Sequence, residues 1–425
     1  MLGFFRSSAE NEGKGGGGQG GIRTHDGLAP MPVFKTGAFN RSATCPGALA
    51  PIGASLSGRV RSGSKRKAKG KDMRKILTVA GAALLMLSGS AMAQTVDPNR
   101  AAQADPEGAF QSWLQTFRTR ALQEGISPAT LDRELSNLEL SERTIELDRR
   151  QPDVGPGRSL YSDYIARRLT QPRIDGGVRL YPQVAPTLEK AEAEYGVPGE
   201  IVLAIWGMET SYGAVTGNFD VVRSLASLAF DGRREALFTK ELVAALKIID
   251  ANDASRSRMT GSWAGAMGNS QFLPTSYLTY AVDFDGDGHP NIWGSESDTI
   301  ASIANYLKQN GWQRGGEWAI PVNVPQSLNR EAVRNPTPPT KCVAVMEKHS
   351  RWMPISEWKK LGVAAEEGRT LPSDDTLATL LEVDGEGTGA HLTFQNYRAL
   401  LDYNCSNFYA LSVGQLADEI AARTQ

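Results

Sequence analysis

The spacing of apolar residues predicts a chain that is mainly helical. Apolar positions recur every three or four residues over 106–150, 183–255 and 298–309, which is the period of a helix with one buried face. The chain is longer than one compact core usually supports. We therefore expect a helical region over residues 94–316, followed by a smaller unit with a different pattern of apolar residues.

Beyond these helices the pattern changes to the alternation typical of strands. Residues 318–324 alternate in the manner of a strand, and 379–383 form a second short strand with which 391–394 can pair. We predict a small insertion of mixed α and β structure over residues 317–395. Residues 396–425 then return to the core as a helical segment, so the fold class is mainly α with a small β-containing inserted domain.

An acidic residue closes the most apolar of the predicted helices. This helix is expected to begin near Pro198, whose missing N–H needs no partner in a first turn, and to stop at Gly213. Ile201, Ile205 and Glu209 are spaced four apart, so Glu209 continues the buried stripe. Desolvation and the helix dipole disfavour its charged form, which suits an acid that protonates a glycosidic oxygen. A buried structural ion pair with an arginine is the alternative.

A secretory signal peptide is predicted at residues 73–93. Met73 and two basic residues begin the signal, an apolar run follows, and small residues lead to a cleavage site after Ala93. Because an export signal acts from the N-terminus, we interpret residues 1–72 as a misassigned or untranslated extension, or as a disordered segment if it is made. A basic arm for nucleic acid is the other interpretation of this extension.

Removal of these segments changes the charge of the chain. The full sequence has 46 basic and 47 acidic side chains, but residues 1–93 hold 14 of the basic and 4 of the acidic ones. The remaining 32 basic and 43 acidic residues give a net charge of −11, which argues against nucleic-acid binding. Gln94 rather than a cysteine follows the cleavage site, and no later stretch could span a bilayer. We expect a soluble periplasmic protein without an integral membrane segment.

Two of the three cysteines are expected in the exported chain. Cys45 lies in the extension, whereas Cys342 and Cys405 would reach an oxidising compartment. A disulfide between Cys342 and Cys405 and two buried free thiols are both open. Their separation in sequence says nothing of the distance between their Cα atoms, which decides whether a disulfide can form.

Residues 261–277 combine small, polar and aromatic side chains. The small residues permit close approach of a backbone or a ligand. Ser262 and Gln271 are polar, and the rings of Trp263 and Phe272 offer flat faces for sugars. Tight helix packing would explain the same composition.

A short acidic segment matches the first half of an EF-hand calcium loop. Asp283, Asp285 and Asp287 take the ligand positions 1, 3 and 5, Gly288 takes position 6, and the backbone carbonyl of His289 falls at position 7. Three spaced acids repel one another unless a cation lies among them. The pattern favours a structural Ca²⁺ site over a simple Asp/Gly-rich turn.

The second half of this loop departs from the EF-hand pattern. Gly294 stands at position 12, where a bidentate Glu is expected. The missing ligand would come from Glu296 or Asp298 just beyond, and we take Asp298 as the candidate. Modest calcium affinity is the expected consequence.

Four separate blocks resemble one known family. In content and order they are similar to the membrane-type B lytic murein transglycosylases, in the soluble form with a cleaved signal. The resemblance spans roughly residues 108–424, with its blocks at 205–213, 264–274, 281–289 and 402–411.

The resemblance implies a lysozyme-like helical catalytic core, of the goose-type and Slt kind, and an enzyme that acts on peptidoglycan. The β-1,4 bond between N-acetylmuramic acid and N-acetylglucosamine would be cleaved without water. Glu209 would protonate the glycosidic oxygen and then act as base on the muramoyl C6 hydroxyl, which closes a 1,6-anhydro ring. Ordinary glycosidases need a second carboxylate, and Asp220, Asp231 and Glu235 remain open as candidates for it.

The resemblance also implies a glycan groove around Glu209. Its substrate-binding side chains would be Arg233, Arg234, Ser262, Gln271, Asn404 and Tyr409. Arg233 and Arg234 could instead pair with Glu235 or Glu241 for structure alone. Peptidoglycan strands are the expected partners, together with other cell-wall enzymes, and the chemistry itself needs no cofactor.

Three other functions remain open at this stage. A hydrolytic muramidase would leave reducing ends, and a non-catalytic murein-binding protein would keep the groove without turnover. A calcium-binding structural protein would rest on the acidic loop alone.

Overall fold

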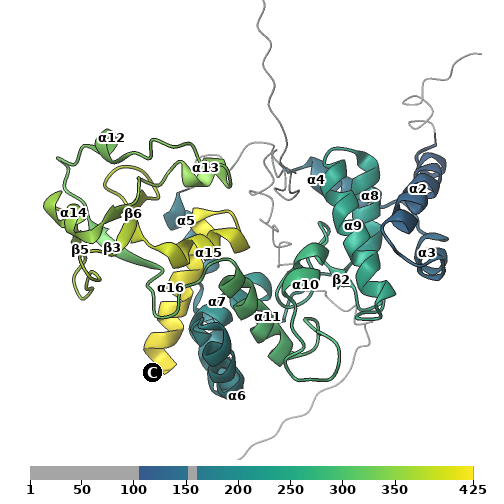
Figure 1. The fold of residues 1–425 in the computed structure, drawn as a ribbon, viewed down its shortest axis with the longest axis horizontal. Coiled ribbons are helices and arrows are strands. Elements are labelled where there is room, and N and C mark those ends of the chain that lie inside the picture. The colour runs from purple at the N-terminus through teal and green to yellow at the C-terminus, as the bar shows by residue number, and fades with distance from the viewer. Residues whose placement is uncertain (1–104, 152–159, 425) are drawn as a thin grey trace, which may run out of the picture.

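Helices predominate in the computed structural model, which describes residues 105–151 and 160–424 (Figure 1). The helices are α2 (Pro106–Gln123), α3 (Pro128–Leu135), α4 (Glu142–Arg149), α5 (Tyr161–Arg168), α6 (Gln171–Tyr195), α7 (Gly199–Thr210), α8 (Val221–Asp231), α9 (Glu235–Asp250), α10 (Pro274–Tyr280), α11 (Glu296–Gln309), α12 (Arg330–Val333), α13 (Val343–Met346), α14 (Ile355–Lys360), α15 (Gln395–Tyr403) and α16 (Asn407–Thr424). The predicted signal peptide, its cleavage site after Ala93, the extension over 1–72 and Cys45 lie outside the described residues. The prediction of a mainly α fold is confirmed.

Side-chain caps fix where several helices begin. Asp105 accepts the backbone N–H of Gly108 at 2.9 Å ahead of α2, and Ser127 accepts that of Thr130 at 3.2 Å ahead of α3. Each cap provides a partner for one of the backbone N–H groups that a first helical turn leaves without one. At the other end of α6, Gly196 takes a left-handed conformation with φ of 76°, which ends that helix before α7.

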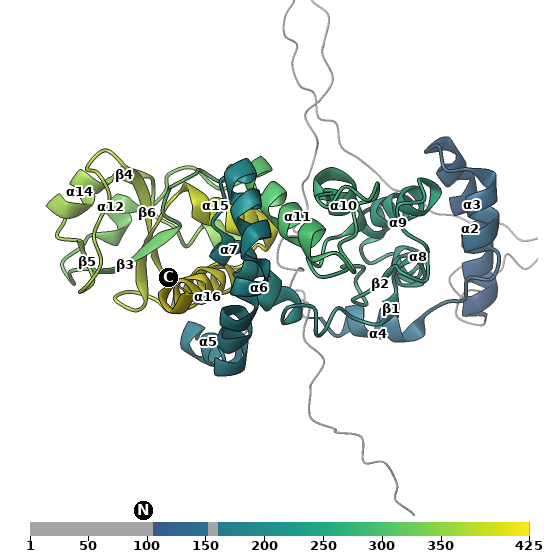
Figure 2. The same ribbon diagram turned by 90° about the horizontal axis from the view of Figure 1, so that it is seen from below.

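The helices divide into two groups on either side of α6, α7 and α11. At one end of the molecule α2, α3 and α4 pack against α8 and α9 (Figures 1 and 2). In the middle, α7 packs against α6, α11 and α16. Among the described helices, none combines the length and the apolar character that crossing a membrane requires.

The strands form a small antiparallel sheet at the opposite end of the molecule (Figure 2). Its order is β4-β6-β7-β3-β5, from β3 (Ala319–Asn323), β4 (Met353–Pro354), β5 (Ala364–Ala365), β6 (Leu377–Glu382) and β7 (Ala390–Thr393). The predicted pairing of 379–383 with 391–394 is confirmed, because Leu380 lies opposite Leu392. A separate two-stranded ladder joins β1 (Phe219–Asp220) to β2 (Thr260–Gly261).

The sheet has an apolar cluster of its own. Its members include Ile320, Trp358 and Leu392, and the indole of Trp358 donates to the carbonyl of Ala378 at 3.2 Å. The larger cluster runs through the helices. Two clusters agree with the expectation of a helical region and a smaller unit, while the domain boundaries at residues 317 and 395 stay a prediction.

Candidate active site

Glu209 is the one residue of α7 that is not buried. Every other member of this helix, from Gly199 to Thr210, is enclosed by its neighbours, whereas Glu209 is half-buried. The helix is apolar along nearly its whole length, so tertiary packing rather than amphipathicity fixes its position. The carboxylate is therefore carried on a rigid element and faces partly outward.

The turn after α7 is unusually constrained. The helix ends at Thr210 rather than at the predicted Gly213, because Ser211 and Tyr212 already take positive φ angles of 51° and 60°. The Tyr212 hydroxyl donates to the carbonyl of Arg173 at 2.9 Å. This contact with α6 holds the turn in a backbone conformation that residues other than glycine rarely adopt.

Three tyrosines surround the carboxylate of Glu209. Tyr409, in the first turn of α16, donates its hydroxyl to Oε1 of Glu209 at 2.9 Å. Burial raises the pKa of Tyr409 and Tyr403 well above the ordinary range, and the nearby charge of Glu209 acts in the same direction. Burial likewise raises the pKa of Tyr164. These hydroxyls stay protonated at neutral pH, and that of Tyr409 donates to the carboxylate.

Sequence reasoning found Tyr409 but missed Tyr403 and Tyr164 as members of this site. Tyr403 lies within one of the family-like blocks, and its hydroxyl donates to the carbonyl of Ser270 at 2.6 Å. Tyr164 belongs to α5, where no motif marked it. Only the folded chain brings α5, α7 and the α15–α16 segment together.

The segment after β2 packs beneath the end of α7. Thr210 Oγ1 donates to the carbonyl of Asn269 at 3.2 Å. Ser262 and Gln271 are buried within this segment: Ser262 Oγ accepts the N–H of Ala266 at 3.0 Å, and the Gln271 amide donates to the carbonyl of Thr216 at 3.0 Å. The structure thus places Ser262 and Gln271 in a loop that abuts the helix of Glu209.

Asn404 is buried just before α16. Its backbone N–H donates to the carbonyl of Leu400 at 3.1 Å, but its side-chain Oδ1 has no hydrogen-bond partner among the described residues. A buried acceptor without a partner is costly. Because Oδ1 is covered by protein, Asn404 would have to turn outward to contact a substrate.

Arg233 and Arg234 converge on one buried carboxylate. Nη1 of Arg233 lies 3.0 Å from Oδ2 of Asp148, and Nη2 of Arg234 binds Oδ1 of the same residue. Asp148 belongs to α4 and is 1% exposed. Of the acids considered from sequence as structural partners, Glu241 accepts the backbone N–H of Thr275 at 2.9 Å, and Glu235 is exposed.

Two of the acids that could have served as a second carboxylate are engaged elsewhere. Asp220 caps α8 through the N–H of Arg223 at 3.0 Å and pairs with Arg256 at 2.7 Å. Asp231 pairs with Arg149. Both carboxylates are held by arginines.

The acidic loop brings three carboxylates together. One oxygen from each of Asp283, Asp285 and Asp287 lies within 4.8 Å of the others. Ca²⁺ binds oxygens at about 2.3–2.6 Å, so oxygens that share one ion lie within about 5 Å of each other. Gly288, at position 6 of the loop, takes a φ of 103°, which permits the sharp turn. The residues at positions 1, 3 and 5 fit a hard cation.

Asp298 and His289 lie outside this cluster of three. Oδ1 of Asp298 accepts the N–H of Phe284 at 2.8 Å, and Oδ2 accepts that of Asn291 at 2.7 Å. Burial raises the pKa of Asp298 above its ordinary value, although these backbone hydrogen bonds oppose the shift. The imidazole of His289 faces Asp253 at 3.5 Å. Asp298 therefore ties both halves of the loop to α11.

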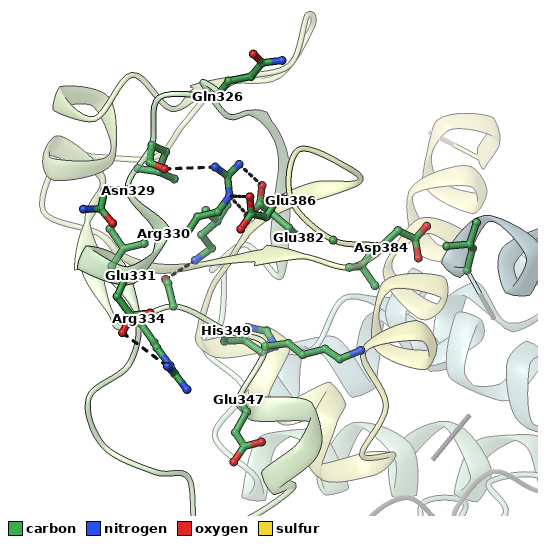
Figure 3. A pocket seen from close by; sticks show the side chains of 18 of the residues that line it. Gln326, Asn329, Arg330, Glu331, Arg334, Glu347, His349, Glu382, Asp384 and Glu386 are labelled. Atoms are coloured by element: carbon green, nitrogen blue, oxygen red, sulfur yellow. Dashed lines mark hydrogen bonds and ion pairs between the residues drawn. The ribbon is translucent and has the colours of Figure 1, made fainter. Parts of the chain in front are cut away.

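A cavity of about 1060 Å³ lies on the sheet side of the molecule (Figure 3). Its lining includes Arg330, His349, Asp384 and Phe408, and Arg330 pairs there with Glu382 at 2.8 Å. Glu209 and the side chains predicted to bind glycan are absent from the lining. The cavity is therefore separate from the site around Glu209.

Cys342 and Cys405 form a disulfide, with their Cα atoms 5.8 Å apart. The bond joins the segment before α13 to the segment between α15 and α16. Of the two alternatives left open by the sequence, the structure contains the bridged one.

Comparison with known proteins gives one consistent result. Residues 109–418 match the family model of the transglycosylase SLT domain. Membrane-bound lytic murein transglycosylase B of Escherichia coli strain K12 is 34% identical over 314 residues, which make up 73% of this chain and 80% of that protein.

Solved structures give the same picture. SltB3 of Pseudomonas aeruginosa, in complex with NAG-anhNAM-pentapeptide, superposes with a TM-score of 0.67 at 39% identity, covering 74% of this chain and 80% of SltB3. The Escherichia coli lytic transglycosylase Slt35, in complex with calcium, superposes with a TM-score of 0.61 at 30% identity, covering 78% of this chain and 100% of Slt35.

Proposed function

Because the chain belongs to the family of membrane-bound lytic murein transglycosylase B, SltB3 and Slt35, it is a lytic transglycosylase that acts on peptidoglycan, and we propose that Glu209 is its catalytic acid and base. The observation that carries this proposal is the hydrogen bond from Tyr409 to Glu209, the one half-buried residue of an otherwise buried helix. A positioned carboxylate beside protonated hydroxyls suits proton transfer to and from a bound sugar.

In the proposed reaction a single carboxyl group acts twice. Glu209 gives its proton to the glycosidic oxygen, so the bond from C1 of N-acetylmuramic acid breaks and N-acetylglucosamine leaves with a new hydroxyl. The carboxylate then removes the proton from the muramoyl C6 hydroxyl while O6 bonds to C1. Glu209 ends protonated, and no water is consumed. SltB3 was solved in complex with an anhydro-sugar ligand, NAG-anhNAM-pentapeptide. That ligand supports an anhydro product for the present chain, which is a relative of SltB3.

The surroundings of Glu209 support a mechanism with one acid. Glycosidases that use water or a covalent intermediate need a second carboxylate within about 10 Å of the first. Asp220 and Asp231 are held in ion pairs with Arg256 and Arg149. The engagement of these two acids supports intramolecular attack by the C6 hydroxyl, and Glu235, which is exposed, is the remaining candidate for a second carboxylate.

Digestion of purified sacculi tests this proposal directly. We expect 1,6-anhydro muropeptides, one water lighter than the products of a hydrolytic muramidase. Glu209→Gln should abolish their release while binding to sacculi persists. Glu200→Gln, at the other end of α7, is the matched control and should remain active. Reducing ends, or activity that survives in Glu209→Gln, would overturn the proposal.

We propose that the glycan groove passes over the loop beneath α7. This route includes Ser262, Gln271 and Asn404 beside Glu209, and the buried orphan acceptor of Asn404 supports a polar contact there. Arg233 and Arg234, which Asp148 holds in place, would meet a carboxylate of the stem peptide. Alanine at either arginine should raise KM for peptide-bearing glycan more than for bare glycan.

We propose a structural Ca²⁺ ion in the loop of Asp283, Asp285 and Asp287. The cluster of their carboxylates and the calcium complex of Slt35 support this assignment. The ion would bring positive charge among three like charges and stiffen the turn. The backbone carbonyl of His289 is the fourth candidate ligand, and Asp298 would orient the loop.

We propose that the mature protein works in the periplasm after cleavage behind Ala93. Its substrate, peptidoglycan, supports this location, as does the predicted signal at residues 73–93. Contact with other cell-wall enzymes stays a prediction.

A further inference from the structure

We propose that the sheet region positions the active site through a clamp on the segment that leads into α16. The clamp consists of His349, Arg398, Thr379, Thr393 and Asn407, together with the disulfide between Cys342 and Cys405. It holds the first turn of α16 so that the Tyr409 hydroxyl stays on Glu209. This inference rests on the proposed role of Glu209, and it makes His349 a positioning residue for catalysis.

Asn407 is the point where the clamp grips α16. It is the first residue of that helix and lies two positions before Tyr409. Its Oδ1 lies 2.9 Å from Nε2 of His349 and accepts the Tyr397 hydroxyl at 3.1 Å, while its Nδ2 donates to the carbonyl of Val345 at 3.1 Å. Three partners from three parts of the chain fix the orientation of this buried amide.

The hydrogen bonds of His349 fix its tautomer. Nη1 of Arg398 lies 3.1 Å from Nδ1 of His349, and a guanidinium can only donate, so Nδ1 is the acceptor. Nε2 therefore carries the proton and donates to Asn407. His349 is 3% exposed. The imidazole acts as a directional link, taking one hydrogen bond from α15 and giving one to α16.

The other side of His349 is anchored to the sheet. Nδ1 lies 3.2 Å from the hydroxyls of Thr379 and Thr393, which face each other across β6 and β7 at 2.8 Å. Arg398 also donates to the Thr379 hydroxyl at 2.6 Å. The position of Asn407 is thus tied to the central strand pair of the sheet.

The disulfide is a second, covalent link between the sheet region and the segment that leads into α16. Cys405 lies two residues before Asn407, and Cys342 lies three residues before Val345, whose carbonyl Asn407 binds. Both links join the same two segments. On the far side, Tyr403 donates to the carbonyl of Ser270, so the segment before α16 is held from two directions.

The consequence for catalysis is geometric. A shift of about 1 Å in a catalytic group can lower the rate by about a hundredfold. Release of Asn407 would let the first turn of α16 move, and Tyr409 would lose the 2.9 Å contact with Glu209. The loss should fall on kcat more than on KM, because the proposed substrate-binding residues Ser262 and Gln271 lie on a separate segment and keep their places.

The primary test compares two buried histidines of the sheet region. His349→Ala should lower kcat by about ten- to a hundredfold with KM changed less than about twofold. His349→Gln should recover most of this loss, because its amide can donate where Nε2 did. His391→Ala is the control, because His391 is also buried but contacts the carbonyl of Gly389 and not the clamp. This variant should lower the melting temperature about as much as His349→Ala does, and it should keep the wild-type kcat.

A double-variant cycle separates positioning from general loosening. If His349 acts through Tyr409, the fold-loss in kcat caused by His349→Ala should vanish in a Tyr409→Phe background. Replacing both Cys342 and Cys405 by Ser should also lower kcat. This double variant replaces His349→Ala in the test if His349→Ala does not fold. Equal kcat losses in His349→Ala and His391→Ala, or independent effects of His349 and Tyr409, would overturn the clamp. Activity in Glu209→Gln would instead overturn the proposed function itself.

Discussion

At the scale of single residues, one hydrogen bond defines the site. Glu209 and Tyr409 are 200 positions apart in the chain, and their contact joins the end of α7 to the start of α16. Burial keeps the hydroxyl of Tyr409 protonated by raising its pKa. The carboxyl group of Glu209 and the hydroxyl that binds it therefore have separate structural supports, and each support can be altered by itself.

The buried His349 gives a prediction about stability at low pH. Burial, with the charge of Arg398 as a second cause, lowers the pKa of His349 to about 3. An unfolded histidine titrates near pH 6.5, so the unfolded chain binds the proton first as the pH falls. The stability that neutral His349 contributes is complete above about pH 6.5 and is lost between about pH 6.5 and 3, by about 1.4 kcal/mol per pH unit.

Urea unfolding at pH 7 and pH 5 measures this effect. The wild-type free energy of unfolding should fall more steeply over this interval than that of His349→Gln. The carboxylates and His391 are common to both proteins, so their contributions cancel in the comparison. Parallel pH dependence in the two proteins would contradict the burial of a neutral His349.

At the scale of elements, close packing around α7, rather than an amphipathic sequence pattern, fixes the position of this helix. Gly207 faces the ring of Tyr212, which folds back between α6 and α7, and a Cβ at residue 207 would lie 2.5 Å from Cζ of that ring. The same ring also lies against Gly176 and Gly177 of α6. The turn that follows Glu209 is therefore fixed by the fit of one tyrosine against three glycines.

Gly207→Ala should therefore disturb both stability and catalysis. Overpacking of this kind costs about 1–3 kcal/mol, and displacement of Tyr212 would move the turn next to Glu209. Thermal unfolding and kcat measure the two effects. In a Tyr212→Ala background the added methyl group meets no ring, so Gly207→Ala should cost little there. An equal cost in both backgrounds would rule out the clash.

At the scale of the whole molecule, the sheet region and the helical core are joined by defined links. Each has its own apolar cluster. The disulfide between Cys342 and Cys405 and the bonds to Asn407 join the sheet region to the segment that leads into α16. The acidic loop lies at the start of α11, which packs against α6, α7 and α15. A ligand in this loop would act on the stability of the central helices.

Calcium should accordingly raise the melting temperature of the whole protein. A ligand that binds only the native state at about 100 times its Kd adds about 2.7 kcal/mol to the free energy of unfolding. Asp285→Asn should remove most of the shift seen on adding Ca²⁺ to chelator-treated protein. Glu347→Gln changes an exposed acid on the sheet side and should retain the shift. Equal shifts in the two variants would discard the loop as the binding site.

Much of the fold was predictable because its signals are local. The helical spacing predicted α2 to α4, α7 to α9 and α11, and the alternation predicted the pairing of β6 with β7. The long helix α6 was only partly predicted, since Pro182 and Pro186 lie inside it and each removes a backbone hydrogen bond. Packing of α6 against α7 and α11 overrides that local cost.

The sequence by itself determined the mainly helical class, the acid at the end of an apolar helix and the family-like blocks. Helical and strand periods, caps and motifs all act over a few residues, so a single chain displays them. Only the tertiary structure decided that Tyr409 meets Glu209, that Asp148 holds Arg233 and Arg234, and that His349 grips Asn407. The physical reason is that such contacts depend on the path of the whole chain, which no local spacing encodes.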